Sequence, residues 1–145
     1  MKATDLMCGD WLLINGTPHK IQAIDSIDAE IQADEELYFV GEDRCHSEDK
    51  IEGIPLTPEI LKKNGFYDRN TQWYYKRFWS KGCFDIAISL VYREIEISKV
   101  CGAGTDCEEV EYDSSIAFGN DICAHTFQQT LRLCGLKELA DNFKV

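Results

Sequence analysis

Cysteine and histidine side chains can bind metal ions, and four of them in the C-terminal part of this sequence could form one site. Among seven cysteines and three histidines, Cys101, Cys107, Cys123 and His125 offer the thiolate and imidazole ligands of a tetrahedral zinc site. Their spacing differs from the common zinc motifs, because five residues separate Cys101 from Cys107 and no second close pair follows. We therefore expect no metal and no cofactor, and these four residues are the ligands if a metal does bind.

His125 could also serve as the base for a neighbouring cysteine or aspartate nucleophile. Such an enzyme needs donors placed to stabilise a developing negative charge, and no motif in the sequence positions them. At the start of a helix, His125 can instead hydrogen-bond a backbone carbonyl or a sheet side chain and fix the docking of that helix. The sequence thus predicts no catalytic residue and favours a non-enzymatic protein. The alternative is a small enzyme or metal-binding protein that uses His125 and cysteines.

The segment 66–81 combines aromatic and basic side chains, which is typical of two kinds of binding surface. Interleaved rings and cations hold single-stranded nucleic acid, and Trp, Tyr and Arg also dominate the hot spots of protein interfaces. If the segment forms a strand, one face would instead lie in the core while Lys76, Arg77 and Lys81 remain in water. The candidate binding residues are Trp73, Tyr75, Arg77 and Trp79.

The formal charge of −11 argues against a dedicated nucleic-acid binder, because affinity for phosphates comes from Lys and Arg. The charge is also unevenly distributed. Between Asp25 and Glu52 there are eleven acidic and two basic residues, whereas between Lys62 and Lys81 there are six basic residues and one acidic residue. Acidic surfaces keep small proteins soluble. They can also bind a basic protein by imitating a phosphate backbone, so we expect another protein as the partner, with single-stranded nucleic acid as the alternative.

Two features of the sequence bear on localisation. The longest apolar run, at 11–14, is far too short to span a bilayer, and the first residues lack the apolar core of a secretory signal. The number of cysteines is odd, which together with the missing export signal favours free thiols over disulfides. We expect a cytoplasmic protein that does not bind membranes.

The helix that the sequence specifies most completely lies at 57–64. Thr57 can cap the first backbone N–H groups, and Pro58 fits the first helical position because its missing donor would be unpaired there. Asn64 and Gly65 supply the left-handed stop that ends many helices. These signals predict a short, rigid linker helix and carry no chemistry of their own.

The same segment, IPLTPEILKKNGF at 54–66, resembles the central signature of a large family of small proteins from gut Bacteroidales genomes, their phages and other mobile elements. The segment 5–11 followed by Asn15-Gly16 resembles the opening of that family, and 125–128 leading into Leu131 resembles its closing helix. The resemblance covers most of the chain apart from roughly 25–50 and 100–115. It implies a fold and a mobile-element or phage-like context, and it implies no particular activity.

Alternating apolar residues predict the remaining elements. Strands at 11–14, 19–24, 27–33 and 37–40 would form a small SH3-like, β-rich lobe over 1–52. After the linker helix, strands are expected at 73–79 and 84–91, then near 95–99 and 110–116, with a break near Arg93-Glu94.

A C-terminal helix is expected at about 121–134, because Phe127, Leu131 and Cys134 share one helical face. Asn120 or Asp121 would cap this helix. The predicted class is α+β. A lobe over 1–52 precedes a second lobe over 53–145, in which the C-terminal helix covers an antiparallel sheet; one compact domain is the alternative.

Overall fold

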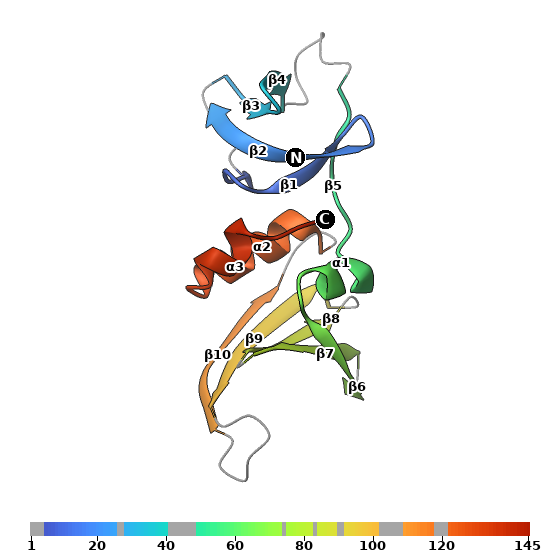
Figure 1. Cartoon of the computed structure of the whole chain (residues 1–145), viewed down its shortest axis with the longest axis vertical. Coiled ribbons are helices and arrows are strands. Elements are labelled where there is room, and N and C mark those ends of the chain that lie inside the picture. The colour runs from blue at the N-terminus through green and yellow to red at the C-terminus, as the bar shows by residue number, and fades with distance from the viewer. Residues whose placement is uncertain are drawn as a thin grey trace. The chain divides into compact units, whose positions relative to one another are not determined.

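The computed structural model of the chain describes residues 5–25, 28–40, 49–73, 75–82, 84–89, 92–101, 109–117 and 122–145. These residues form two antiparallel five-stranded sheets and three short helices, which confirms the expected α+β class (Figure 1). The chain divides into two compact units, one built from residues 1–55 and 123–143 and the other from 56–122. Within the part that is described, no helix has the length and apolar character needed to cross a membrane.

The sheet of the first unit has the strand order β4-β3-β2-β1-β5. Its strands are β1 (Trp11–Ile14), β2 (Thr17–Asp25), β3 (Glu30–Ala33), β4 (Glu36–Phe39) and β5 (Ile51–Gly53). The expected hairpin turn between β1 and β2 is present, with positive φ angles at Asn15 (52°) and Gly16 (82°), as a two-residue turn between twisted strands requires. The SH3-like form of this lobe stays a prediction.

Alternation along β1 and β3 builds the core of the first unit. Leu12 and Ile14 on β1, and Ile31 and Ala33 on β3, are buried while their neighbours are not. Helices α2 (Ala124–Leu133) and α3 (Lys137–Asp141) belong to the same unit, and α2 packs against β1 (Figure 1). The sequence had associated the C-terminal helix with the second sheet, whereas the structure groups it with the first.

The start of α2 differs from the expected one. Cys123, and not Asn120 or Asp121, is the residue that precedes the first turn, and both of those residues lie outside the described part of the chain. Cys123 is extended (φ −112°, ψ 167°) because it forms an isolated bridge with Pro55, and the N–H of Ala124 donates to the carbonyl of Ile54 at 2.8 Å. Pairing with residues far away in the sequence thus moves the start of α2 to Ala124.

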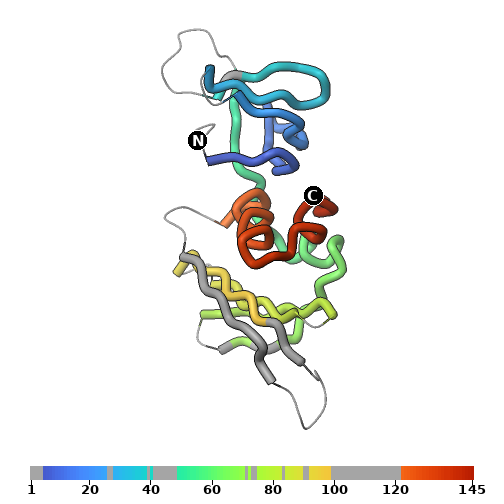
Figure 2. The backbone as a smooth tube through the Cα atoms, turned by 90° about the vertical axis from the view of Figure 1, so that its left-hand side faces the viewer, coloured from blue at the N-terminus to red at the C-terminus, as the bar shows by residue number. Residues whose placement is uncertain are grey.

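The second unit is a meander with the strand order β10-β9-β8-β7-β6, preceded by one helix. Its elements are α1 (Pro58–Lys63), β6 (Tyr67–Trp73), β7 (Lys76–Lys81), β8 (Phe84–Ser89), β9 (Glu94–Cys101) and β10 (Glu109–Ala117). Figure 2 shows the coloured parts of β7 to β9 running side by side. The expected caps of α1 are confirmed, since Thr57 Oγ1 accepts from the N–H of Ile60 at 3.3 Å and Gly65 has a φ of 79°.

The break expected near Arg93-Glu94 is a turn between β8 and β9, where Arg93 has a φ of 53°. This turn sets the register of β8 and β9 so that the apolar residues of both strands face the same side of the sheet. Ile86 pairs with Ile97 and Ile88 pairs with Ile95, so residues of opposite parity in the sequence share one buried face of the sheet.

Candidate functional site

The aromatic and basic strip at 66–81 lies mainly on β6 and β7, and the structure divides its four candidate residues. Trp79 is only 2% exposed and belongs to the core of the second unit. Tyr75, in the turn before β7, is 55% exposed, and the side chain of Arg77 is 54% exposed. The side chain of Trp73 lies outside the described part. Of the three candidate side chains that the structure describes, Tyr75 and Arg77 are therefore the ones available for surface contacts.

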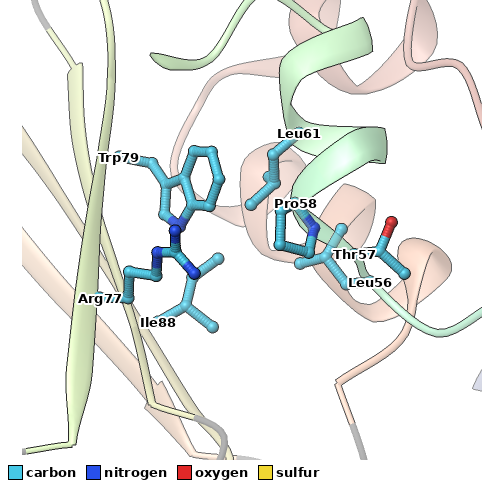
Figure 3. A pocket seen from close by; sticks show the side chains of 7 residues that line it. All are labelled: Leu56, Thr57, Pro58, Leu61, Arg77, Trp79 and Ile88. Carbon is cyan, nitrogen blue, oxygen red and sulfur yellow. The ribbon is translucent and has the colours of Figure 1, made fainter. Parts of the chain in front are cut away.

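Arg77 is held in place by an aspartate and a ring. Its Nε donates to Asp68 Oδ2 at 3.0 Å, a second donation from Nη2 reaches the same oxygen, and its guanidinium lies 5.3 Å from the centre of the Trp79 ring (Figure 3). The hydrogen bonds from Arg77 lower the pKa of the Asp68 carboxyl, and the same bonds raise the pKa of Arg77. The charge of Arg77 is thus already compensated within the unit.

Other cations of the strip are paired in the same way. Arg69 forms an ion pair with Asp85, and Lys76 contacts both Glu94 and Glu96. The hydrogen bond to Glu96 is the main reason why the pKa of Lys76 is raised. Phosphate binding would have to displace these carboxylates, so the strip is less suited to single-stranded nucleic acid than its composition indicated.

A small pocket of about 80 Å³ lies where α1 faces β7 and β8 (Figure 3). Its lining consists of Leu56, Thr57, Pro58, Leu61, Arg77, Trp79 and Ile88. This space is well below the several hundred cubic ångströms of a typical ligand site. The lining shows that α1 with the residues before it packs on the aromatic and basic strip.

Tyr92 forms an exposed aromatic pair with Tyr75 that the sequence did not indicate. The two rings meet edge to face with centroids 5.8 Å apart, and Tyr92 is 60% exposed. Tyr92 lies an even number of positions from the buried Ile86 and Ile88, so strict alternation would place it on their face of the strand. Because β8 ends at Ser89, Tyr92 lies in a turn instead, and only recognition of that turn could have predicted its exposure.

Two of the four conditional metal ligands come together in the first unit. Cys123 Sγ and His125 Cε1 lie 2.6 and 3.0 Å from the point where a Cβ on Gly53 would stand. The side chain of Cys101 and the whole of Cys107 lie outside the described residues. Among the residues that the structure does describe, no group of three or more His, Cys, Asp or Glu side chains is arranged to hold a metal ion.

His125 is 8% exposed, and its Nδ1 is buried without a hydrogen-bond partner in the described structure. Nδ1 therefore does not make the docking hydrogen bond that the sequence suggested. Burial lowers the pKa of the imidazole, and the negative charges of Asp10 and Asp5 oppose this only in part. His125 is neutral at pH 7 as a consequence.

The stability of the protein should fall as the pH drops below about 6.5, the ordinary pKa of histidine. Because the folded pKa of His125 is lowered, the unfolded chain binds the proton first, and stability is lost between that pH and the folded pKa. One such proton contributes at most about 1.4 kcal/mol per pH unit. Urea unfolding between pH 5 and 7.5 would measure this, and His125→Gln should show a smaller slope. An equal slope in the variant would contradict the role of His125.

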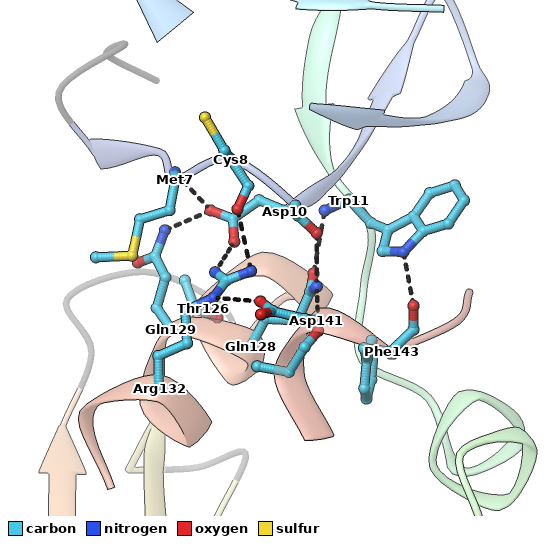
Figure 4. Close-up of polar contacts among 12 residues, drawn as sticks. Met7, Cys8, Asp10, Trp11, Thr126, Gln128, Gln129, Arg132, Asp141 and Phe143 are labelled. Carbon is cyan, nitrogen blue, oxygen red and sulfur yellow. Dashed lines mark hydrogen bonds and ion pairs between the residues drawn. The ribbon is translucent and has the colours of Figure 1, made fainter. Parts of the chain in front are cut away.

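A buried polar network joins α2 and α3 to β1 in the first unit (Figure 4). Asp10, which is fully buried, accepts hydrogen bonds from the N–H of Met7 (2.9 Å), Gln129 Nε2 (2.7 Å) and Arg132 Nη1 (2.5 Å). Arg132 also reaches Asp141 Oδ1 at 3.4 Å. These contacts satisfy the buried carboxylate, which indicates a structural role.

Gln128 extends this network through its buried amide. Its Oε1 accepts from the N–H of Trp11 at 3.0 Å, while its Nε2 donates to the carbonyls of Gly9 and Ala140 at 2.8 and 3.0 Å. Trp11 Nε1 in turn donates to the carbonyl of Phe143 at 2.9 Å. The network fastens both C-terminal helices to β1.

Comparisons with known proteins identify no relative of this chain. No protein-family model, no curated protein and no solved structure matches the chain. The surfaces of the two units are therefore the features from which a function can be inferred.

Proposed function

We propose that this chain is a non-enzymatic accessory protein that binds a basic protein partner through the acidic surface of its first unit. Residues 21–40 contain six carboxylates and no Lys, Arg or His. Five of these carboxylates are exposed on β2, β4 and the adjoining turns: Asp25, Asp28, Asp34, Glu35 and Glu36. Asp34 contacts Nδ1 of His19 at 2.6 Å, whereas residues 21–40 themselves hold no Lys or Arg. This cluster, called the acidic surface below, carries the proposal.

The carboxylates stand where they oppose folding. Asp25 and Glu30 are direct cross-strand partners of β2 and β3, and like charges in such pairs are destabilising. Asp34 and Glu35 both have positive φ angles, 51° and 68°, in the turn before β4, a conformation that disfavours side chains such as glutamate. Because these charges weaken the fold, their presence is better explained by binding to a partner than by a role in stability.

A partner with a positively charged surface is the one that this arrangement favours. Rows of carboxylates can take the place of nucleic-acid phosphates and occupy a nucleic-acid-binding protein. The contrast with the second unit supports this choice, because Arg69, Lys76 and Arg77 of the strip are paired with carboxylates of the same unit and Trp79 is buried. The fourth cation of the strip, Lys81, donates to the carbonyl of Asn64. The family resemblance adds the proposal of a phage-like or mobile-element context, and we further propose that the protein acts in the cytoplasm.

The proposal is tested by affinity capture from a Bacteroidales lysate, with and without nuclease, at low and moderate salt. We expect a basic protein to be recovered regardless of nuclease, and its binding to weaken steeply as salt screens the carboxylates. Binding that does not depend on salt would contradict the phosphate-mimic hypothesis.

Neutralising part of the acidic surface should weaken the captured complex by about ten-fold, since each of three surface charges contributes on the order of 0.5 kcal/mol. The variant is Asp28→Asn/Glu35→Gln/Glu36→Gln, and titration calorimetry or surface plasmon resonance measures the change in Kd. A matched control, Glu52→Gln/Glu59→Gln/Glu138→Gln, removes three charges elsewhere and should change Kd less than two-fold. Equal losses in both variants would show that net charge alone is responsible.

A further inference from the structure

Strand β4 forms one edge of the first sheet (Figure 1). Among the residues that the structure describes, it pairs with β3 in continuous register along its whole length. The edge strand β6 of the second sheet instead contains a register shift, a feature that usually keeps an edge from pairing with another chain. The pairing of β4 therefore permits an added strand where that of β6 opposes it.

The register directs the backbone of Leu37 away from β3. The N–H of Val40 donates to the carbonyl of Ala29 at 2.7 Å, just beyond the paired strands. Hydrogen-bonded and non-hydrogen-bonded pairs alternate along an antiparallel ladder, so Glu36 and Tyr38 occupy hydrogen-bonded pairs and Leu37 lies between them. The N–H and C=O of Leu37 consequently point toward the edge, where a further strand can bond to both.

Leu37 also presents an apolar side chain at this edge. It is 67% exposed and lies opposite Gln32 of β3, on the face of the sheet away from the core. The neighbouring Tyr38 faces the other side and packs against the core of the unit. In an added strand, the side chain directly across from Leu37 would cover it. The site therefore fits a segment that carries an apolar residue at that position.

The charges around β4 favour a basic strand. Glu36 begins β4, and Asp34 and Glu35 form the turn before it; all three are exposed. The hydrogen bond that Tyr38 donates to Glu36 at 2.8 Å is the main reason why the pKa of the Tyr38 hydroxyl is raised, with further contributions from burial and from nearby carboxylates. Like charges would oppose the β4 strand of a second copy, whereas Lys or Arg side chains beside the apolar position would be attracted.

We propose that the basic partner binds by adding an extended segment to β4 as a further antiparallel strand. This inference rests on the proposed function and names the form in which the partner binds. The segment places an apolar residue across from Leu37, and the Lys or Arg residues on either side of it lie across from Glu36 and Tyr38. Backbone hydrogen bonds to Leu37 add affinity that salt screens little, while the carboxylates provide the salt-dependent part.

Two peptides of equal charge test this proposal on the full-length protein. The first is acetylated and amidated Lys-Val-Lys-Val-Lys-Val-Lys, and the second has the same sequence with N-methylated valines. A valine across from Leu37 donates its N–H in the added ladder, so N-methylation removes this bond and leaves every charge in place. We expect the N-methylated peptide to bind about ten-fold more weakly in titration calorimetry at low salt. In two-dimensional NMR, the first peptide should slow the hydrogen exchange of the Leu37 amide.

A pair of variants separates the backbone of Leu37 from its side chain. Leu37→Pro removes the outward N–H and Leu37→Ala retains it, while both shorten the apolar side chain. Because this N–H takes no part in the ladder with β3, proline is tolerated there. Leu37→Pro should bind the unmethylated peptide about five-fold more weakly than Leu37→Ala does. Urea unfolding checks that both variants are folded, and if one is not, the two peptides on the wild-type protein decide.

Three outcomes would overturn the proposal, and they differ in what they imply for the proposed function. Equal binding of both peptides, lost in Asp28→Asn/Glu35→Gln/Glu36→Gln, would exclude strand addition and retain the acidic surface as the binding site. Absence of binding by either peptide at low salt would contradict the proposed function as well. A dimer of the protein alone in analytical ultracentrifugation, disrupted by Leu37→Pro, would show that a second copy covers β4.

Discussion

Replacement of Asp10 by alanine is expected to lower the free energy of unfolding by about 3–5 kcal/mol, since it removes the shorter of the two ion pairs that Arg132, a partly buried cation, makes with Asp10 and Asp141. The side chain of Arg132 is 13% exposed and Asp10 is fully buried, so water cannot easily take the place of the lost carboxylate. The variant also removes the acceptor for the N–H of Met7 and for Gln129 Nε2. Urea unfolding followed by far-UV circular dichroism measures the loss.

The control for Asp10→Ala is an ion pair on the surface of the same unit. Lys50 and Glu52 are 73% and 45% exposed, and Glu52→Ala should cost less than about 1 kcal/mol. The double variant Asp10→Ala/Arg132→Met should recover part of the loss, because the partly buried cation that has lost its shorter ion pair is then absent. If Asp10→Ala costs no more than Glu52→Ala, the network does not fasten the helices to β1.

Local signals in the sequence were sufficient for α1 and for the hairpin turn of the first sheet. Thr57, Pro58 and Gly65 determine the caps of the helix through contacts within a few residues, and Asn15-Gly16 determines the turn. The α+β class follows from such elements. Each of them has a hydrophobic periodicity, a cap residue or a turn residue that can be recognised without knowing which other elements it packs against.

The polar network could not be predicted, since it joins residues that are far apart in the sequence. Asp10 and Arg132 are separated by 122 positions, and Trp11 donates to a carbonyl at position 143. Cys123 was missed as the N-cap for the same reason, because its extended conformation depends on Pro55. A propensity scale favours Asn or Asp at such a position, and it contains no information on a distant bridge.

The candidate strip shows a different limit of sequence reasoning. Arg77 and Trp79 are two residues apart on β7 and so share one face, yet one is exposed and the other is buried. The two-residue repeat of a strand identifies the face on which a side chain lies. How far each side chain on that face is buried depends on the position of α1. The indole is covered near Leu61, whereas the longer arginine reaches the mouth of the pocket and Asp68 (Figure 3).

The two units therefore use charge in different ways. In the second unit, carboxylates of β6, β8 and β9 neutralise Arg77, Arg69 and Lys76. In the first unit, the acidic surface has no Lys or Arg within residues 21–40. The opposing charge blocks in the sequence consequently do not have equivalent roles, and the acidic one is the better candidate for a binding surface.

Replacement of Trp79 by alanine should lower the free energy of unfolding by about 3–5 kcal/mol, the range for removal of a large buried aromatic side chain. Trp79 is 2% exposed and is among the largest fully covered side chains of the chain. Its removal also withdraws the ring on which the Arg77 guanidinium rests. Thermal and urea unfolding would measure the effect, and hydrogen exchange in β7 and β8 would assign it to the second unit.

Tyr75→Ala provides the matched aromatic control, because Tyr75 is 55% exposed and a surface substitution usually changes stability by less than about 1 kcal/mol. The pair of variants separates a core residue from a binding residue within one strip. A loss of binding in Trp79→Ala would report unfolding, whereas a loss in Tyr75→Ala at unchanged stability would identify a contact surface. If Trp79→Ala instead keeps wild-type stability, the indole is not part of the core, and the aromatic strip becomes a candidate binding surface again.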